Sequence, residues 1–218
     1  MTAVATVLFV GNSFVTRNEV PALVSALAAT AGVVVRTATI AAGGASLRRH
    51  HNSGAISAAL ARDRWDQVVL QEQSTLPIKN RARFHENVRA VRDEIVAASA
   101  ASGHPSPPAI VLYNTWARRS ARPTQVDLDT AVAAIATEID ARVAPAGRAW
   151  EVVLASHPEV ELYDRDGSHP TAAGSFLAAC ALALTMFADR RSQILAPPVP
   201  KVDPGTAAVL LDAARSVA

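Results

Sequence analysis

The chain has 218 residues, of which 50% are hydrophobic and 18% charged, and its net charge is +2. This length suffices for a sizeable core, and the apolar fraction excludes a disordered chain. The longest apolar run, residues 176–188, is shorter than the roughly 20 residues of a membrane-spanning helix. A single cysteine, Cys180, excludes an intramolecular disulfide and cysteine-based metal sites.

Short apolar runs alternate with longer helix-like stretches, which is typical of a parallel α/β domain. Strands are expected over residues 4–10, 33–40, 66–71, 109–113 and 143–145. Helices are expected over residues 19–30, 81–99, 124–142, 148–155, 171–189 and 205–217, with an interrupted helical stretch around residues 53–54. Cys180 lies within the apolar helix 171–189 and is expected in the core.

A proline-containing segment, residues 195–204, precedes the last expected helix. We interpret it as a surface linker to a helix that packs on the domain, so residues 1–218 are expected to form one domain. The 21 basic residues are scattered among 19 acidic ones, which predicts no nucleic-acid partner. No secretion signal is recognised at the start, and a cytoplasmic protein is expected.

A serine follows the first expected strand directly, in the segment LFVGNSF at residues 8–14. Ligands of open α/β sheets bind outside the carboxyl ends of the strands, which makes Ser13 a candidate nucleophile. Taken alone, the segment is also an ordinary turn with a helix-capping residue.

A histidine and an aspartate lie close together near the other end of the chain, in the segment DRDGSHP at residues 164–170. A local turn can place the Asp166 carboxylate beside one ring nitrogen of His169 and leave the other nitrogen facing outward. A general-base histidine requires this orientation. Taken alone, the segment is also compatible with a helix N-terminus that carries a surface histidine.

Together the two segments resemble the SGNH (GDSL-like) hydrolase family. Residues 11–13 stand where that family has Gly-Asp-Ser, with Asn in place of Asp, and residues 166–169 are similar to its late Asp-x-x-His block. The resemblance extends from the first strand through the helix after His169. It implies a flavodoxin-like three-layer α/β/α sandwich with a parallel five-stranded sheet, with Ser13 as nucleophile, His169 as base and Asp166 as the residue that orients His169.

The resemblance also implies an oxyanion hole, to which the Ser13 N–H contributes. The family usually offers a second backbone N–H from a glycine after the second strand, and the segment AAGGAS at residues 41–46 fits that place. Gly44 is the first choice for this donor and Gly43 the second.

The third oxyanion donor is expected after the third strand, where the family usually has Gly-x-Asn-Asp. This chain reads QEQS at residues 71–74, and sub-branches of the family carry a similar run. A glutamine amide supplies the same kind of N–H donor as asparagine. Gln73 is preferred, with Gln71 as the alternate donor. Glu72 is interpreted as a solvated loop acid, with a residue that orients a loop or binds a sugar hydroxyl as the alternative.

Substrate-binding residues are expected at the same rim of the sheet. Trp116 and Arg118 follow the fourth expected strand, where tryptophan offers a flat apolar face and arginine a bidentate donor. A surface tryptophan packed on loop neighbours is an equally good interpretation of Trp116. Asn12, beside the candidate nucleophile, is also predicted to bind substrate.

These expectations together predict a serine hydrolase that cleaves a short-chain acyl ester, such as an acetyl ester, through an acyl-Ser13 intermediate. The substrate would be a small-molecule or carbohydrate ester, with no membrane partner. No metal ion and no organic cofactor are expected, because the histidines lack partners at ligand spacing and no phosphate-binding loop occurs. An acyltransferase with the same triad and a non-catalytic flavodoxin-like module that binds an ester or sugar are the alternatives.

Overall fold

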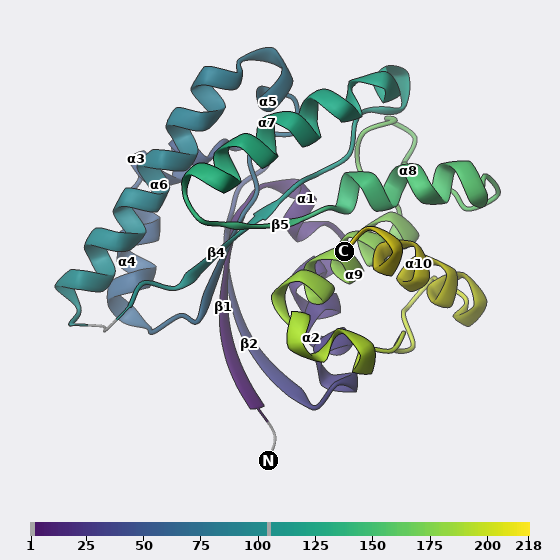
Figure 1. Ribbon diagram of the computed structural model, residues 1–218, viewed down its shortest axis with the longest axis horizontal. Helices are drawn as coiled ribbons and strands as arrows, with labels where there is room; N and C mark the ends of the chain where they lie inside the picture. Colours follow the sequence, from purple (N-terminus) through teal and green to yellow (C-terminus); the bar gives the residue numbers. More distant parts are fainter. Residues whose placement is uncertain (1–2, 104–105) are drawn as a thin grey trace.

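The computed structural model describes residues 3–103 and 106–218, and in these residues a five-stranded parallel sheet lies between two layers of helices (Figure 1). The order of the strands across the sheet is β2-β1-β3-β4-β5. The strands are β1 (Ala3–Gly11), β2 (Val33–Ala41), β3 (Gln67–Leu70), β4 (Ala109–Tyr113) and β5 (Arg142–Ala144).

The helices connect these strands and continue beyond the last one. The α-helices are α1 (Ser13–Thr16), α2 (Val20–Thr30), α3 (Leu47–Asn52), α4 (Ala55–Arg62), α5 (Leu76–Lys79), α6 (Arg81–Ala101), α7 (Gln125–Glu138), α8 (Ala146–Ser156), α9 (Ala172–Met186) and α10 (Pro204–Val217). Three short 3₁₀ segments are η1 (Arg17–Glu19), η2 (Arg119–Thr124) and η3 (Ala188–Gln193).

β1 is buried from Val7 to Gly11, and β3 is buried along its whole length, because both faces of the sheet are covered there. Successive side chains of a strand point to opposite faces. Val7 and Phe9 of β1 pack with α2, α8, α9 and α10, whereas Leu8 and Val10 pack with α3, α4, α6 and α7. The predicted three-layer α/β/α sandwich is confirmed.

Most of the expected elements lie within a few residues of their observed bounds, and β4 has the predicted bounds. The helix expected over residues 124–142 ends at Glu138 instead, because Asp140 adopts a left-handed conformation (φ 54°) and β5 begins at Arg142. The helix expected over residues 171–189 ends at Met186. Cys180 is fully buried in α9, as predicted.

The sheet reverses its winding at β1, and this position locates the site. The connection from β1 to β2 passes through α2 on one face, whereas the connection from β2 to β3 passes through α3 and α4 on the other. The loops after β1 and β3 therefore diverge at the carboxyl edge and leave a crevice in which open α/β sheets bind ligands. Within residues 3–103 and 106–218, no helix is both long and apolar enough to span a bilayer.

Candidate active site

Ser13 lies at the tight turn between β1 and α1. Gly11 ends the strand, and a Cβ on it would lie 2.6 Å from Gln71 Oε1 and 2.7 Å from Val15 Cγ2, so only glycine fits this close approach. Ser13 then begins α1, and its Oγ lies 2.9 Å from His169 Nε2. The structure thus brings together two side chains that are 156 residues apart in the chain.

His169 is oriented by the loop that precedes α9. Its Nδ1 lies 2.5 Å from Asp166 Oδ2, while Asp166 Oδ1 accepts hydrogen bonds from the backbone N–H groups of Ser168 and His169, both at 2.9 Å. Gly167 turns the loop with a φ of 65°. The hydrogen bond to His169, followed by the two backbone hydrogen bonds, holds the pKa of Asp166 well below its usual range.

Two contacts tie the segment after Ser13 to the His169 loop. Arg17 forms an ion pair with Asp164, and Asn18 Nδ2 donates to Thr171 O at 3.1 Å and to Ser175 Oγ at 2.8 Å. Asn18 adopts a left-handed conformation (φ 53°), which asparagine tolerates better than most residues. The sequence alone does not indicate a role for these residues, because nothing in a polar loop residue points to a partner so distant in the chain.

Asn12 holds the loop after β2 against the Ser13 turn. Its Oδ1 accepts from Phe14 N at 3.1 Å, its Nδ2 donates to Ala45 O at 3.0 Å, and its own N–H donates to Gln71 Oε1 at 2.9 Å. Only 2% of Asn12 is exposed. Both ends of its amide are used inside the protein, so its position does not match the predicted contact with substrate.

Gln71 is also committed to internal hydrogen bonds. Its Oε1 accepts from Asn12 N–H, its Nε2 donates to the Glu72 carbonyl, and the residue is fully buried. Gln71 therefore links the loops after β1 and β3, and both ends of its amide have a partner within the protein.

Glu72 is buried, with 6% of its surface exposed, so its interpretation as a solvated loop acid is wrong. Its Oε1 accepts from the backbone N–H groups of Leu47 (3.1 Å) and Gln73 (2.7 Å), and its Oε2 accepts from Asn87 Nδ2 at 2.9 Å. Burial raises the pKa of Glu72, and these hydrogen bonds partly offset the effect. The carboxylate thus fixes the loops after β2 and β3 to each other and to α6.

Among the residues that the structure describes, the expected oxyanion donors have no hydrogen-bond partner. These donors are the backbone N–H groups of Ser13, of Gly44 and of its alternate Gly43, and the side-chain NH₂ of Gln73. Gln73 Oε1 accepts from the backbone N–H of Thr75 at 3.0 Å and from its hydroxyl at 3.1 Å, which leaves Nε2 free. These donors come from the segments that follow β1, β2 and β3 at the carboxyl edge of the sheet.

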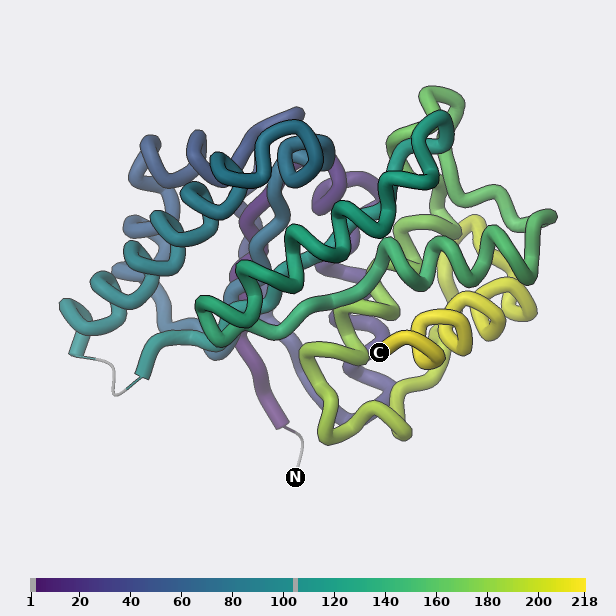
Figure 2. The backbone as a smooth tube through the Cα atoms, turned by 45° about the horizontal axis from the view of Figure 1, so that its top comes forward, coloured from purple at the N-terminus to yellow at the C-terminus, as the bar shows by residue number. Residues whose placement is uncertain are grey.

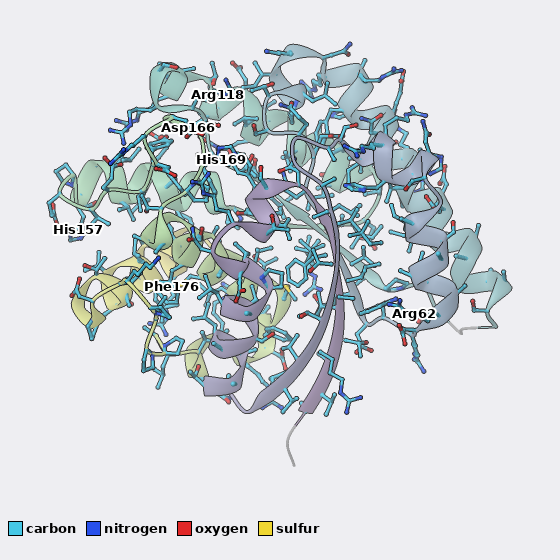
Figure 3. The ribbon with its side chains drawn as sticks, turned by 180° about the vertical axis from the view of Figure 1, so that it is seen from behind. Arg62, Arg118, His157, Asp166, His169 and Phe176 are labelled. Carbon is cyan, nitrogen blue, oxygen red and sulfur yellow. The ribbon has the colours of Figure 1, made fainter. Side chains whose placement is uncertain are left out.

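Trp116 packs in the interior and forms a hydrogen bond to the loop that carries His169. It stacks on Trp150 at a ring distance of 3.7 Å, and its indole N–H donates to Ser168 O at 3.0 Å. Only 2% of Trp116 is exposed, which excludes the surface tryptophan considered in the sequence analysis. It also lines a cavity of about 200 Å³ together with the exposed Arg118. Figure 3 shows Arg118 near Asp166 and His169 at one end of the molecule.

The remaining histidines close to the site have structural partners. His50 Nε2 lies 2.7 Å from Gly11 O, and His51 Nδ1 lies 2.6 Å from Glu94 Oε2. Over residues 3–103 and 106–218, no three His, Cys, Asp or Glu side chains are grouped so that they hold a metal ion.

No family model and no curated protein matches the sequence. Among solved structures, the chain is similar to a protein from Slackia heliotrinireducens assigned to the SGNH hydrolases. The two are 31% identical over 84% of this chain and 99% of that chain, with a TM-score of 0.70. The chain belongs to the SGNH hydrolase family. This membership confirms the predicted enzyme class, an ester hydrolase.

Two further structures share the fold of this SGNH hydrolase. A DUF4886 family protein from Bacteroides uniformis is 20% identical over 98% of this chain and 94% of that chain, with a TM-score of 0.79. An acetyl xylan esterase from Geobacillus stearothermophilus is 15% identical over 91% of this chain and 100% of that chain, with a TM-score of 0.58. At these identities the likeness shows the fold alone.

Proposed function

We propose that this SGNH hydrolase cleaves a short-chain acyl ester of a small molecule or carbohydrate through an acyl-Ser13 intermediate. The observation that carries the proposal is the continuous contact from Asp166 through His169 to the Ser13 hydroxyl, at 2.5 Å and 2.9 Å. This arrangement has the geometry of a nucleophile, a general base and an orienting carboxylate.

In the first half of the reaction, His169 Nε2 takes the proton of the Ser13 hydroxyl as Oγ attacks the ester carbonyl. Asp166, an ionised carboxylate, accepts the Nδ1 proton of His169 in a hydrogen bond and stabilises the imidazolium. The imidazolium then protonates the leaving alcohol. In the second half, His169 removes a proton from water, which attacks the acyl-Ser13 and releases the carboxylic acid.

The negative charge that develops on the carbonyl oxygen is stabilised by the N–H groups of Ser13 and Gly44 and by the amide of Gln73. Gly43 remains the second choice in the glycine segment. We prefer Gln73 to Gln71 because the Gln71 amide is occupied at both ends, whereas Gln73 Nε2 is free among the described residues. Loss of one such donor typically lowers kcat about 10²–10³-fold.

The preference for acetyl esters is supported by the similarity in fold to an acetyl xylan esterase. Trp116 and Arg118 are the substrate-binding residues of this proposal. They line a cavity of about 200 Å³, which offers both an apolar wall and a charged donor.

Turnover of 4-nitrophenyl esters of increasing acyl length tests the proposal. We expect the acetate to be the best substrate, and we expect Ser13→Ala to lower kcat by about 10³-fold or more. Ser156→Ala is the matched control, because Ser156 is an exposed serine at the end of α8 whose hydroxyl bonds only to Val152 O. Equal turnover by wild type and Ser13→Ala would refute the assignment of the nucleophile.

The same assay separates the two alternatives. A non-catalytic binding module shows no turnover that depends on Ser13. An acyltransferase forms a new ester when an acceptor alcohol is added, which product analysis with and without the acceptor detects.

A further inference from the structure

The cavity that Trp116 and Arg118 line is formed by two chain segments that meet at the carboxyl edge of the sheet. One segment comprises α5 and the residues just before it, and the other runs from the end of β4 through η2 into the first turn of α7. Its wall is largely apolar: Ile78, Trp116 and Leu128 face it, and Ile78 remains 37% exposed. The volume of about 200 Å³ accommodates a short carbon chain.

Two cations lie at this apolar wall, Lys79 at the end of α5 and Arg118 at the start of η2. Both are exposed, and neither side chain has an ion-pair or hydrogen-bond partner in the described part of the chain. Among the described residues, no acidic one lines the cavity. In contrast, Arg119 and Arg122, which follow on the same segment, each form an ion pair with a glutamate.

The acidic residues of the neighbouring loop, residues 164–170, already bind other groups. Asp164 pairs with Arg17, and Asp166 binds His169 and two backbone N–H groups. The positive charges of Lys79 and Arg118 are therefore not neutralised by this loop.

The cavity adjoins the proposed catalytic groups. Thr75, which lines it, is the residue that anchors Gln73. On the other side, the segment after β4 runs beside the loop of residues 164–170 (Figure 2), where the Arg119 N–H donates to Gly167 O at 2.9 Å. A ligand with one end in the cavity therefore has its other end close to the oxyanion donors and the triad.

We propose that this cavity binds a negatively charged group of the ester substrate, with Lys79 and Arg118 as its counter-ions. This inference rests on the proposed function of the site. Carboxylate, sulfate and phosphate share the chemistry that arginine and lysine recognise, Arg118 as a planar fork and Lys79 as a compact charge. The apolar wall takes the carbons between the charge and the ester, and it strengthens the charge interaction by excluding water.

Pairs of esters that differ only in charge test the proposal. For a charge on the acyl side, the pair is mono-4-nitrophenyl glutarate and its methyl ester. For a charge on the alcohol side, the pair is 4-acetoxybenzenesulfonate and the corresponding neutral methyl sulfone. The measured quantity is the ratio of kcat/KM for the anionic ester to that for the neutral ester.

We expect the ratio in one of the two pairs to fall about fivefold in Arg118→Gln or Lys79→Gln, the upper end for an exposed ion pair. The double variant should lose about tenfold or more, and raising the ionic strength from about 0.02 M to about 0.5 M should lower the wild-type ratio. Arg36→Gln is the matched control, because Arg36 is exposed on β2 outside the cavity. It should leave the ratio and the basal activity unchanged.

A ratio that is the same in wild type and in the double variant, for both pairs, overturns the anion site. The proposed function still stands if Ser13→Ala abolishes turnover in the same experiment. If wild type turns over no ester, the proposed function fails, and calorimetry with glutaric acid mono-4-nitroanilide on Ser13→Ala protein decides the anion site alone. A Kd weakened about fivefold by either substitution supports it, and an unchanged Kd overturns it.

Discussion

Replacement of Glu72 by alanine removes the acceptor that joins the loops after β2 and β3. The substitution leaves the backbone N–H groups of Leu47 and Gln73 and the Asn87 amide without an acceptor in a buried place. An unsatisfied buried donor costs about 1–3 kcal/mol. Three such donors, at the lower end of that range, lower the free energy of unfolding by about 3 kcal/mol.

Glu72→Gln separates the charge from the hydrogen bonds. Its side-chain oxygen still accepts from Leu47 and Gln73, but its NH₂ group meets the NH₂ group of Asn87. The Asn87 amide then has to turn, which gives up its hydrogen bond from Arg48 (3.1 Å). We expect a loss of about 1 kcal/mol, the net value of one such bond.

The two substitutions also differ from wild type in the pH dependence of stability. Burial raises the folded-state pKa of Glu72 above its unfolded value. The folded protein therefore binds this proton more tightly, and the associated stabilisation is present below the unfolded pKa and is lost as pH rises through the folded pKa. Glu72→Gln removes this component, so its stability falls less than that of wild type over the same pH interval.

Urea unfolding followed by tryptophan fluorescence at several pH values measures these differences, and ester turnover on the same samples measures the catalytic effect. We expect Glu72→Ala to lower kcat, because Gln73 loses the contact that fixes its backbone. Glu86→Gln is the control, because Glu86 is an exposed acid of α6 whose ion-pair partners are Arg48 and Arg83. The reasoning is refuted if Glu72→Ala loses less than about 1 kcal/mol and keeps full turnover, or if Glu72→Gln shows the pH profile of wild type.

Gln73→Ala should lower kcat for ester hydrolysis about 10²-fold or more while the urea midpoint stays within error of wild type; unchanged turnover would assign the donor to another group. Asn18→Ala removes the hydrogen bonds to Thr171 and Ser175 and places alanine in a left-handed conformation, so we expect about 2 kcal/mol of lost stability by urea unfolding; Asn18→Gly, which relieves the strain, should lose less. Gly11→Ala puts a methyl group 2.6 Å from Gln71 Oε1 and should lower both stability and kcat, measured by thermal unfolding and ester turnover; wild-type values of both would show that the turn tolerates a side chain.

The sequence by itself determined the fold class, and it named Ser13, Asp166 and His169 as candidates for the chemistry. Residues 7–10 of β1 and residues 68–70 of β3 are apolar runs because both faces of the central strands are buried there. Asp166 and His169 are predictable as a pair because a single turn brings them together, so their contact is encoded within four residues. Ser13 is a candidate in the sequence because the end of an apolar strand marks the edge of the sheet where ligands bind.

Tertiary structure alone decided how the loops around these residues are held. The sequence predicts substrate contact for Asn12, an alternate oxyanion donor in Gln71 and a solvated acid in Glu72. In the structure each is buried and bonds across loops, and the partners of Asn12, Ala45 and Gln71, lie 33 and 59 residues away. Their partners depend on which loops meet where the sheet reverses its winding. A polar loop residue has the same local sequence signature whether water or a distant backbone N–H satisfies it. The sequence likewise does not indicate that Lys79 and Arg118 lie at one cavity, because that cavity exists only after the segment following β4 and α5 come together.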